Sequence, residues 1–379
     1  MERIIDDLCE KKRGIYSIAP NSGWNDQQLT KNCGIVPYLF HKNYGYRAVM
    51  LGTRLQESYP SLERYVKGVE MDFLPDATWE SECSYLNTHY QDMDVLLLHG
   101  LFPFYFPILH HYRQLRPDGK VYLELDPNVY YEDRLEWTHP AFLRFFQECD
   151  VIGASCHRMQ KCLGQKWPCV VEYLPNGFYN FDQLDMQVDF TQKENIILTV
   201  GRIGSAQKRN EELLEAFAKV YKRLPNWQVR LVGGVEPGFE RWLKDFCLHY
   251  PRISRQIVLT GPIFEKSELL SEYKRAKIFA LTSVLEGGTP NVVAEALFSG
   301  CYMITSEIDA ADDVIDEGRC GQKYECGDTN ALADILCHAC MDEERLLQGG
   351  RRAIAYAQEE YDFQKIIQRL YWLLFKEMK

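Results

Sequence analysis

Short apolar runs alternate with longer segments of helical periodicity along most of the chain. In the first half, residues 26–43 have helical spacing, and the apolar runs predict strands at 14–19, 46–51, 94–99, 120–125 and 151–154. Strands that alternate with helices are typical of βαβ units, whose strands pair in a parallel sheet. The pattern therefore predicts an α/β fold.

The same pattern begins again near residue 190. Strands are expected at 195–200, 227–232, 256–260, 278–282 and 302–305, and helices at 211–224, 267–276 and 291–299. This restart predicts two tandem doubly wound, Rossmann-like domains.

The length of the chain agrees with two domains, because 379 residues exceed the ~250–300 at which a single core stops growing. We place an N-terminal domain at 1–185, a C-terminal domain at 186–360 and a last helix at 361–379, with the polar stretch 181–193 as the join. Ligands of such sheets bind beyond the carboxyl ends of the strands, so we expect the site in a cleft that the two domains face.

Charge and cysteine content narrow the class of protein. The formal net charge of −11 argues against nucleic acid as a partner, which needs a basic surface. The 13 cysteines are an odd number and are scattered, so we interpret them as reduced thiols rather than a disulfide framework. The one Cys-x-x-Cys, Cys337–Cys340, lies in an apolar helical stretch, where core cysteines are favoured over a metal site.

No stretch approaches the ~18–20 apolar residues of a membrane span, and the charged first residues do not resemble a signal peptide. A cytoplasmic location is therefore expected, with the inner face of the membrane as an alternative. The tail 361–379 is an amphipathic helix, for which we favour packing on the first domain over contact with a membrane, because its polar face mixes charges.

Two loops of the second half carry candidate chemistry. In the first, Arg202 and Lys208 flank a turn that follows a strand and contains Gly201, and two fixed cations suit a diphosphate; a solvated basic loop explains them equally well.

In the second loop, Glu286 and Glu295 bracket Gly287, Gly288 and the start of a helix. Glycines let backbone N–H groups approach a ligand, and a helix N-terminus attracts phosphate. Glu295 is placed to accept ribose hydroxyls, and Glu286 those of a second ring. The alternatives are a favourable charge near the helix start and a surface carboxylate, but neither explains two glutamates around one glycine pair.

These loops together resemble the retaining GT-B glycosyltransferases of family 4. The similarity covers roughly Asn195 to Ala333 and rests on four segments in the family's order: VGRIGSAQK, LTGPI, LTSVLEGGTPNVVAEALFSG and DVIDEGRCGQKYECGD. One residue more than the family's usual number separates Glu286 from Glu295, and an extra loop glycine accounts for it.

The resemblance implies roles for individual residues. Arg202 and Lys208 would hold the donor diphosphate, Glu286 the sugar hydroxyls and Glu295 the ribose. Further donor contacts would come largely from the backbone, at Gly201, Ile263, Gly287, Gly288, Thr289, Pro290, Asn291 and Val292. The residues of the LTGPI segment, which contains Ile263, by themselves favour a simple turn over a binding loop.

The first half resembles the family more loosely. Gly23 stands where the family has a glycine-rich loop near the donor phosphates. His99 and Asp126 each end a strand and are candidates for the acceptor side, although many members of the family have a histidine where this chain has Asp126. A core or turn histidine and a turn aspartate are equally good interpretations. The Pro-Asn-Gly turn at Pro175 is interpreted as structural.

The implied reaction is transfer of a sugar, from a UDP-sugar by preference, to an acceptor hydroxyl with retention of configuration, in bacterial glycan or glycoconjugate synthesis. No metal or other cofactor is expected beyond the nucleotide-sugar substrate. The acceptor could be a saccharide, a protein or a lipid-linked glycan, and peripheral membrane contact stays open. The aromatic run Leu101–Leu109 is either core, which we favour, or the wall of an acceptor groove. A nucleotide-sugar epimerase and an inactive binding subunit are the alternatives for function.

Overall fold

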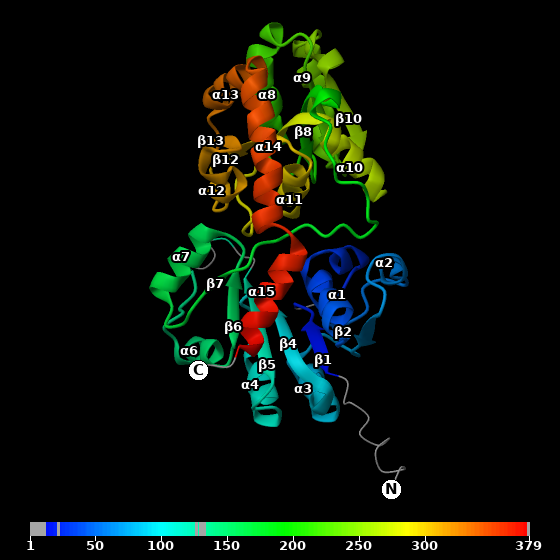
Figure 1. Cartoon of the computed structure of the whole chain (residues 1–379), viewed down its shortest axis with the longest axis vertical. Helices are drawn as coiled ribbons and strands as arrows, with labels where there is room; N and C mark the ends of the chain where they lie inside the picture. Colours follow the sequence, from blue (N-terminus) through cyan, green and yellow to red (C-terminus); the bar gives the residue numbers. More distant parts are fainter. Residues whose placement is uncertain (1–12, 21–22, 126–127, 129–133, 377–379) are drawn as a thin grey trace. The chain divides into compact units, whose positions relative to one another are not determined.

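A computed structural model describes residues 13–20, 23–125, 128 and 134–376. The chain divides into two compact units (Figure 1). The first contains the chain up to Leu174 together with the segment from Phe363 onward, and the second runs from Pro175 to Asp362. The first unit therefore ends before the predicted boundary at residue 185. In the described part of the chain, no helix combines the length and the apolarity that a membrane span requires.

The first unit is built on a parallel sheet. Within the described residues it has seven strands in the order β3-β2-β1-β4-β5-β6-β7. The order reverses between β1 and β4, which are neighbours, so the switch point of this doubly wound sheet lies there. The strands are β1 (Gly14–Ile18), β2 (Arg47–Gly52), β3 (Val69–Phe73), β4 (Met93–His99), β5 (Lys120–Leu125), β6 (Val151–Ala154) and β7 (Glu172–Tyr173).

The helix predicted over 26–43 is two elements in the structure. A 3-10 helix, η1 (Asp26–Thr30), is capped by Asn25, and Lys31 is then extended (ψ −179°) before α1 begins. The helices described in this unit are α1 (Asn32–Tyr44), α2 (Pro60–Arg64), α3 (Trp79–His89), α4 (Tyr105–Leu115), α6 (Pro140–Gln147), α7 (His157–Lys166) and α15 (Phe363–Phe375), with the 3-10 turn η2 (Tyr90–Asp92).

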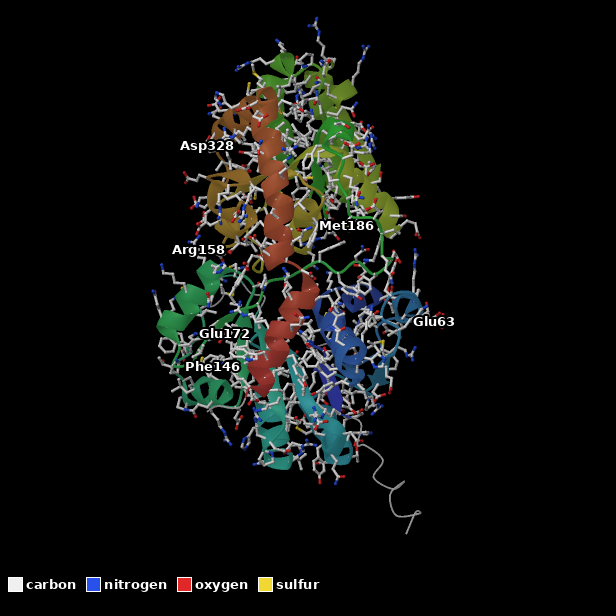
Figure 2. The ribbon with its side chains drawn as sticks, viewed as in Figure 1. Glu63, Phe146, Arg158, Glu172, Met186 and Asp328 are labelled. Atoms are coloured by element: carbon white, nitrogen blue, oxygen red, sulfur yellow. The ribbon has the colours of Figure 1, made fainter. Side chains whose placement is uncertain are left out.

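The last helix, α15, packs against α1 within the first unit (Figure 1). The Tyr371 ring stacks on Tyr44 with centroids 3.9 Å apart, and Phe375 lies near Tyr46 at 6.3 Å. On the same helix, Arg369 lies 3.4 Å from Glu172 of β7, which is labelled in Figure 2. Residues far apart in the sequence thus share one core.

The second unit has its own parallel sheet. Its six described strands follow the order β10-β9-β8-β11-β12-β13, so β8 and β11 are neighbours at the switch point. The strands are β8 (Glu194–Val200), β9 (Gln228–Val232), β10 (Ile257–Gly261), β11 (Ala276–Leu281), β12 (Tyr302–Ser306) and β13 (Gly321–Tyr324).

Helices α8, α9 and α13 bury one face of this sheet. Leu213, Phe239 and Leu336 belong to these helices and share one apolar cluster with Ile197 and Leu231 of the sheet. The helices described in the unit are α8 (Asn210–Val220), α9 (Pro237–His249), α10 (Lys266–Arg275), α11 (Asn291–Phe298), α12 (Ala311–Val314), α13 (Thr329–Met341) and α14 (Glu343–Glu360), with 3-10 turns η3 (Phe190–Gln192), η4 (Tyr221–Arg223), η5 (Ile253–Gln256) and η6 (Asp316–Gly318).

Two sequence features with open interpretations lie in these cores. Cys337 and Cys340 are buried in the apolar cluster beneath α13. In the aromatic run, Leu101 and Tyr105 are buried, and Phe106 packs on Phe145 with centroids 4.7 Å apart. The structure thus gives both features a packing role.

Candidate functional site

The two loops with candidate chemistry begin at adjacent strands. Arg202 and Lys208 follow β8, and Glu286 follows β11, which pairs directly with β8. Both loops therefore leave the same edge of the sheet at its switch point, where open α/β sheets bind ligands. The topology alone brings the cationic loop and the glutamate loop together.

The side chains of these loops form a connected group. Lys208 Nζ donates to the Glu286 carboxylate, and the two side chains are 15% and 9% exposed. Gln207 Nε2 donates to the other Glu286 oxygen at 3.2 Å, while Gln207 Oε1 accepts from Arg202 Nη2 at 2.6 Å. Two cations and one carboxylate thus lie within one hydrogen-bonded chain.

Backbone contacts fix this group in place. Val284 N donates to Gln207 O at 2.8 Å, and the Thr282 hydroxyl donates to Lys208 O at 2.7 Å. The buried Ser283 hydroxyl donates to the Glu286 carboxylate. These bonds tie the glutamate loop to the cationic loop, and electrostatic catalysis requires groups that are held in place in this way.

The glycine loop leads into α11. Gly288 has a φ of 75°, a left-handed conformation that favours glycine. Thr289 follows, and its carbonyl accepts from Asn176 Nδ2 at 2.9 Å. Asn176 belongs to the Pro-Asn-Gly turn that the sequence suggested to be structural, and the turn supports the glycine loop. Gly287 lies between Glu286 and Gly288 at the centre of this loop.

Helix α11 presents its N-terminus beside this loop. Pro290 precedes the helix in an extended conformation (ψ 144°), so it is the N-cap residue. Asn291 and Val292 open the helix, where the first N–H groups have no partner within the helix. Asn291 Oδ1 is buried and has no hydrogen-bond partner among the described residues. The helix end thus offers polar groups to a ligand.

Glu295 lies one turn into α11 and bonds to a tyrosine of α10. Its Oε2 accepts from the Tyr273 hydroxyl at 2.7 Å. Burial raises the pKa of Glu295, and the hydrogen bond from Tyr273 and the charge of Lys266 oppose that rise. Burial also holds the pKa of Tyr273 well above its usual value, so this hydroxyl stays a hydrogen-bond donor.

Two further predicted donor residues follow strands of the same sheet. Gly201 comes directly after β8, and its N–H donates to Val232 O at 3.0 Å. Ile263 comes two residues after β10 and is half-buried, whereas the neighbouring Phe264 side chain is 79% exposed.

His99 ends β4 in the first unit and bonds through both ring nitrogens. Nδ1 lies 2.6 Å from the Glu124 carboxylate, and Nε2 lies 2.7 Å from the Ser17 hydroxyl. The His99 and Trp24 rings are nearly perpendicular, with their centroids 5.7 Å apart. Because both nitrogens have partners, a substrate group would have to displace Ser17 to reach Nε2. The structure thus places His99 in a buried network with Ser17 and Glu124, a network the sequence did not predict.

From the sequence, Gly23 and Asp126 of the first domain are also expected near the site, and of these two the structure describes only Gly23. Gly23 has a φ of 112°, and a Cβ there would lie 2.2 Å from the Thr53 carbonyl oxygen, so its glycine is required by packing within the unit. Asp126 lies outside the described residues.

Sequence reasoning missed Gln207, Ser283 and Tyr273. One feature of the sequence pointed to Gln207 as a site residue, because it precedes Lys208 in a loop with candidate chemistry. The other two were detectable only through contacts with Glu286 and Glu295, because a serine after a strand and a tyrosine in a helix are ordinary residues at such positions.

The arrangement suits a ligand with a diphosphate between two polyhydroxyl groups. Arg202, Lys208 and the α11 N-terminus supply positive charge, and Glu286 and Glu295 supply hydrogen-bond acceptors in the same loop and helix. Cations balance the charge of a diphosphate, and carboxylates accept hydrogen bonds from hydroxyls.

Comparison with known proteins supports the glycosyltransferase class that the loops of the second half resemble. Residues 194–342 match the family model described as glycosyl transferases group 1, and this match lies within the second unit. The match covers less than half of the chain.

A curated relative from Campylobacter jejuni is named GalNAc-alpha-(1->4)-GalNAc-alpha-(1->3)-diNAcBac-PP-undecaprenol alpha-1,4-N-acetyl-D-galactosaminyltransferase. It is 27% identical over 203 residues, which are 52% of this chain and 52% of the relative. The chain therefore matches about half the length of this curated relative.

Solved structures share the fold over almost the whole chain. Sucrose-phosphate synthase from Thermosynechococcus elongatus is 16% identical with a TM-score of 0.69, covering 96% of this chain and 98% of that one. HepE from Anabaena in complex with UDP is 15% identical with a TM-score of 0.69, covering 95% and 98%. A glycosyltransferase from Rickettsia africae is 14% identical with a TM-score of 0.73, covering 97% and 99%. The expected α/β architecture of two Rossmann-like units, of the GT-B type, is confirmed.

Proposed function

We propose that this protein is a retaining glycosyltransferase that moves a sugar from a nucleotide diphosphate sugar to an acceptor hydroxyl. The observation that carries the proposal is that Lys208 and Gln207 both donate to Glu286, in the loop that leads into α11, while Arg202 donates to Gln207. The match of residues 194–342 to glycosyl transferases group 1 supports glycosyl transfer as the type of reaction.

In the proposed reaction, the bond between the sugar C1 and the diphosphate oxygen breaks, and a bond from C1 to the acceptor oxygen forms on the same face. The acceptor proton passes to an oxygen of the leaving phosphate. Arg202 and Lys208 stabilise the charge that grows on the diphosphate, and Glu286 orients the sugar hydroxyls. Fixed electrostatic groups of this kind often supply the largest part of catalysis.

A UDP-sugar is the preferred donor in this proposal, and bacterial glycan or glycoconjugate synthesis the setting. One fold relative, HepE, was crystallised with UDP, and the curated relative is named for transfer to an undecaprenol-linked glycan. We propose a saccharide or a lipid-linked glycan as the acceptor, with protein as the alternative.

The outer face of α15 supports contact with an anionic membrane surface. Its exposed residues are cationic or neutral, whereas the sequence predicted a polar face of mixed charge for 361–379. The difference arises because the acidic residues Asp362 and Glu377 of that stretch lie outside α15. The whole chain, by contrast, has a net charge of −11. Trp372 is 60% exposed, and Lys376 Nζ lies 4.7 Å from its ring centroid. Tryptophan beside basic side chains is typical of helices that lie on a lipid surface. The exposed residues are Lys365, Gln368, Arg369, Trp372 and Lys376.

The test is an incubation of the full chain with UDP-, GDP- and ADP-sugars, with and without an acceptor lysate, and with EDTA in a parallel series. We expect nucleotide release that depends on acceptor, persists in EDTA, and is lost in Lys208→Ala. Product anomers read by NMR decide between retention and inversion.

The same incubation tests the alternatives. A nucleotide-sugar epimerase would form an epimer without any acceptor. An inactive binding subunit would bind the nucleotide sugar but would not cleave it, so no nucleotide would be released. Either result would replace the proposed function.

A further inference from the structure

Arg209, the residue after Lys208, has a backbone conformation that residues with a side chain rarely adopt. Its φ is 43° and its ψ 46°, in the left-handed region, which a Cβ disfavours about tenfold against the right-handed helical region. Arg209 is also the N-cap of α8. An N-cap residue usually has an extended backbone and a side chain that bonds to the first turn, and Arg209 has neither. The surrounding structure must therefore hold this conformation.

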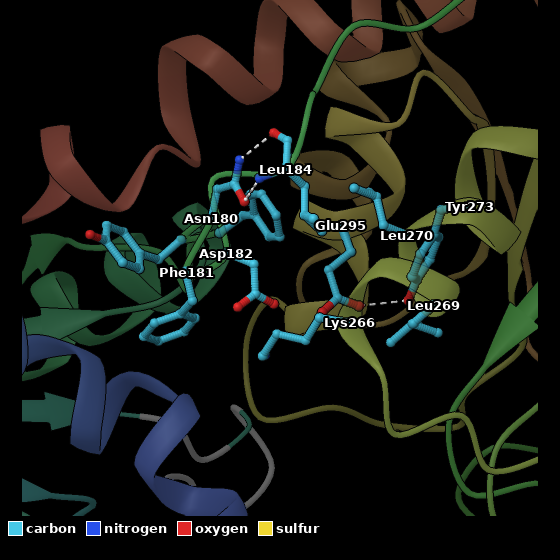
Figure 3. A pocket seen from close by; sticks show the side chains of 11 residues that line it. Asn180, Phe181, Asp182, Leu184, Lys266, Leu269, Leu270, Tyr273 and Glu295 are labelled. Atoms are coloured by element: carbon cyan, nitrogen blue, oxygen red, sulfur yellow. Dashed lines mark hydrogen bonds between the residues drawn. The ribbon is translucent and has the colours of Figure 1, made fainter. Parts of the chain in front are cut away.

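Three other described non-glycine residues have a left-handed φ, and none of them adjoins a cation of the site. Gln183 has a φ of 50°, and its turn is closed by two bonds between the Asn180 side chain and the Leu184 backbone, at 2.7 and 2.9 Å. Figure 3 draws these bonds as dashed lines, in a turn that lies beside α10. The pair 316–317 belongs to the 3-10 turn η6. Within the described ranges, Arg209 is the one such residue next to a proposed ligand cation.

The side chain of Glu212 holds that of Arg209. Arg209 Nε lies 3.1 Å from Glu212 Oε2, and the Glu212 side chain is 1% exposed. The other Glu212 oxygen accepts from Gly327 N at 2.9 Å, and Arg209 Nη1 lies 3.9 Å from Cys326 Sγ. A buried carboxylate that loses its cation is left with an uncompensated charge, so this pair resists separation. Glu212 thus ties Arg209 to the loop that follows β13.

The turn at Arg209 sets the direction of Lys208. The Thr282 hydroxyl lies 2.7 Å from Lys208 O and 3.2 Å from Arg209 O. The N–H groups of Lys208 and Arg209 both donate to Ser205 O, at 2.9 and 3.1 Å. The peptide that joins Lys208 to Arg209 is therefore held at both ends, and the Lys208 side chain leaves it to reach Glu286. The dihedral angles of Arg209 fix how this peptide is joined to α8.

We infer that Arg209 is a positioning residue whose ion pair with Glu212 holds the left-handed turn that directs Lys208 at the donor diphosphate. The inference rests on the proposed function, which places a diphosphate at Lys208. Because the Arg209 guanidinium is paired with Glu212, it acts through the backbone of the turn and not as a third cation for the ligand. A group that stabilises developing charge must be held close to its productive position, and residues outside the site supply that support.

The test compares two substitutions at one position in the full chain. Arg209→Gly and Arg209→Ala remove the same ion pair, but glycine adopts the left-handed conformation freely and alanine does not. The measurements are kcat with the nucleotide sugar that the donor panel selects, and the affinity for inorganic pyrophosphate by calorimetry. Arg209→Ala should lower both about tenfold. Arg209→Gly should keep both within about threefold of wild type.

A second pair of variants tests the role of Glu212. Glu212→Gln keeps an acceptor for Gly327 N but removes the charge that holds Arg209, so both measurements should again fall about tenfold. Adding Arg209→Gly to Glu212→Gln should restore them, because glycine holds the turn without a partner. A merely structural role of Glu212 would not be rescued in this way. Glu215→Gln, an exposed residue of α8, is the matched control and should change neither measurement.

Three results would contradict the inference: equal values in Arg209→Gly and Arg209→Ala, wild-type values in Glu212→Gln, or no recovery in the double variant. Each would show that the left-handed turn does not need the Arg209–Glu212 pair to position Lys208. A wild type that neither binds pyrophosphate nor releases nucleotide would instead reject the proposed function, so the two failures are distinguishable.

Discussion

Arg202 is connected to Glu286 through the side chain of one glutamine. Gln207 accepts from Arg202 at 2.6 Å and donates to Glu286 at 3.2 Å. Lys208, the next residue, reaches the same carboxylate directly. The position of each cation therefore depends on the glutamate loop. A ligand that contacts Glu286 will also interact electrostatically with both cations.

The first prediction concerns this connection. Gln207→Ala removes a hydrogen bond to a charged group at each end, to Arg202 and to Glu286. Hydrogen bonds to charged groups contribute about 1.5–3 kcal/mol each, so we expect kcat to fall at least roughly tenfold. Gln207→Glu should be worse, because a second carboxylate would face Glu286. Steady-state kinetics with saturating donor checks both, and an Ala variant with normal kcat would show that Arg202 needs no such support.

The two cations themselves should matter more. Arg202→Ala and Lys208→Ala should each reduce turnover roughly 100- to 1000-fold, the usual loss when a fixed group that stabilises developing charge is removed. Thermal unfolding should change little. Lys219→Ala is the control, because Lys219 is a surface cation on α8 that contacts Thr329. Near-normal turnover in either site variant would place the diphosphate elsewhere.

Glu295→Gln should act mainly on donor binding. An amide keeps the hydrogen bond from Tyr273 but accepts ribose hydroxyls less well, so the donor KM should rise while kcat changes less. Burial raises the pKa of Glu295 above that of an ordinary glutamate, which is near 4.3. On acidification, the donor affinity of the wild type should therefore begin to weaken at a higher pH than an ordinary glutamate would give. The Gln variant should lose that pH dependence. A pH profile of nucleotide affinity measures both effects.

Glu82 of α3 makes the stability of the first unit depend on pH. Its carboxyl group is buried, Oε2 has no hydrogen-bond partner among the described residues, and burial raises its pKa from 4.5 to about 8. The folded state retains a proton that the unfolded state releases, so stability should fall as pH rises from about 4.5 to about 8.

Glu82→Gln should remove that loss. One pKa unit corresponds to about 1.4 kcal/mol, so the variant should be more stable than wild type by a few kcal/mol at pH 8.5. Urea unfolding at pH 5.5 and 8.5 measures the difference. Glu63→Gln, an exposed residue of α2, should not change it. A wild type that is equally stable at both values would mean that Glu82 is paired in solution.

The basic face of α15 predicts binding to anionic vesicles. Full-length protein should sediment with vesicles that contain phosphatidylglycerol and not with neutral phosphatidylcholine vesicles. Arg369→Glu with Lys376→Glu should reduce binding at least tenfold, since each basic side chain near such a surface contributes about 1 kcal/mol. Lys222→Glu with Arg223→Glu makes the same charge change on the second unit. Equal effects of both pairs would indicate a response to net charge alone.

Much of the fold could be predicted because the central strands are apolar runs. The strand predicted at 120–125 is β5 without a change of bounds. The edge strands β3 and β13 were missed, since VEMDF and GQKY mix polar and apolar residues and have a partner on one side only. The split before α1 was missed because it depends on the backbone of Lys31, which has no clear signal in the sequence.

The candidate site was predictable where it follows strands and glycines. Lys208 and Glu286 were singled out from their loops, and the adjacency of β8 and β11 brings them together. The turn closed by Asn180 was not predicted, because the stretch from Phe181 onward reads only as a polar join. Its position beside α10 depends on tertiary packing, which local sequence does not encode.

The return of α15 to the first unit has a consequence for biosynthesis. Tyr44 and Tyr46 acquire their partners Tyr371 and Phe375 only after almost the whole chain has left the ribosome. While the second unit is being translated and can already fold, one flank of the amino-terminal sheet therefore remains uncovered.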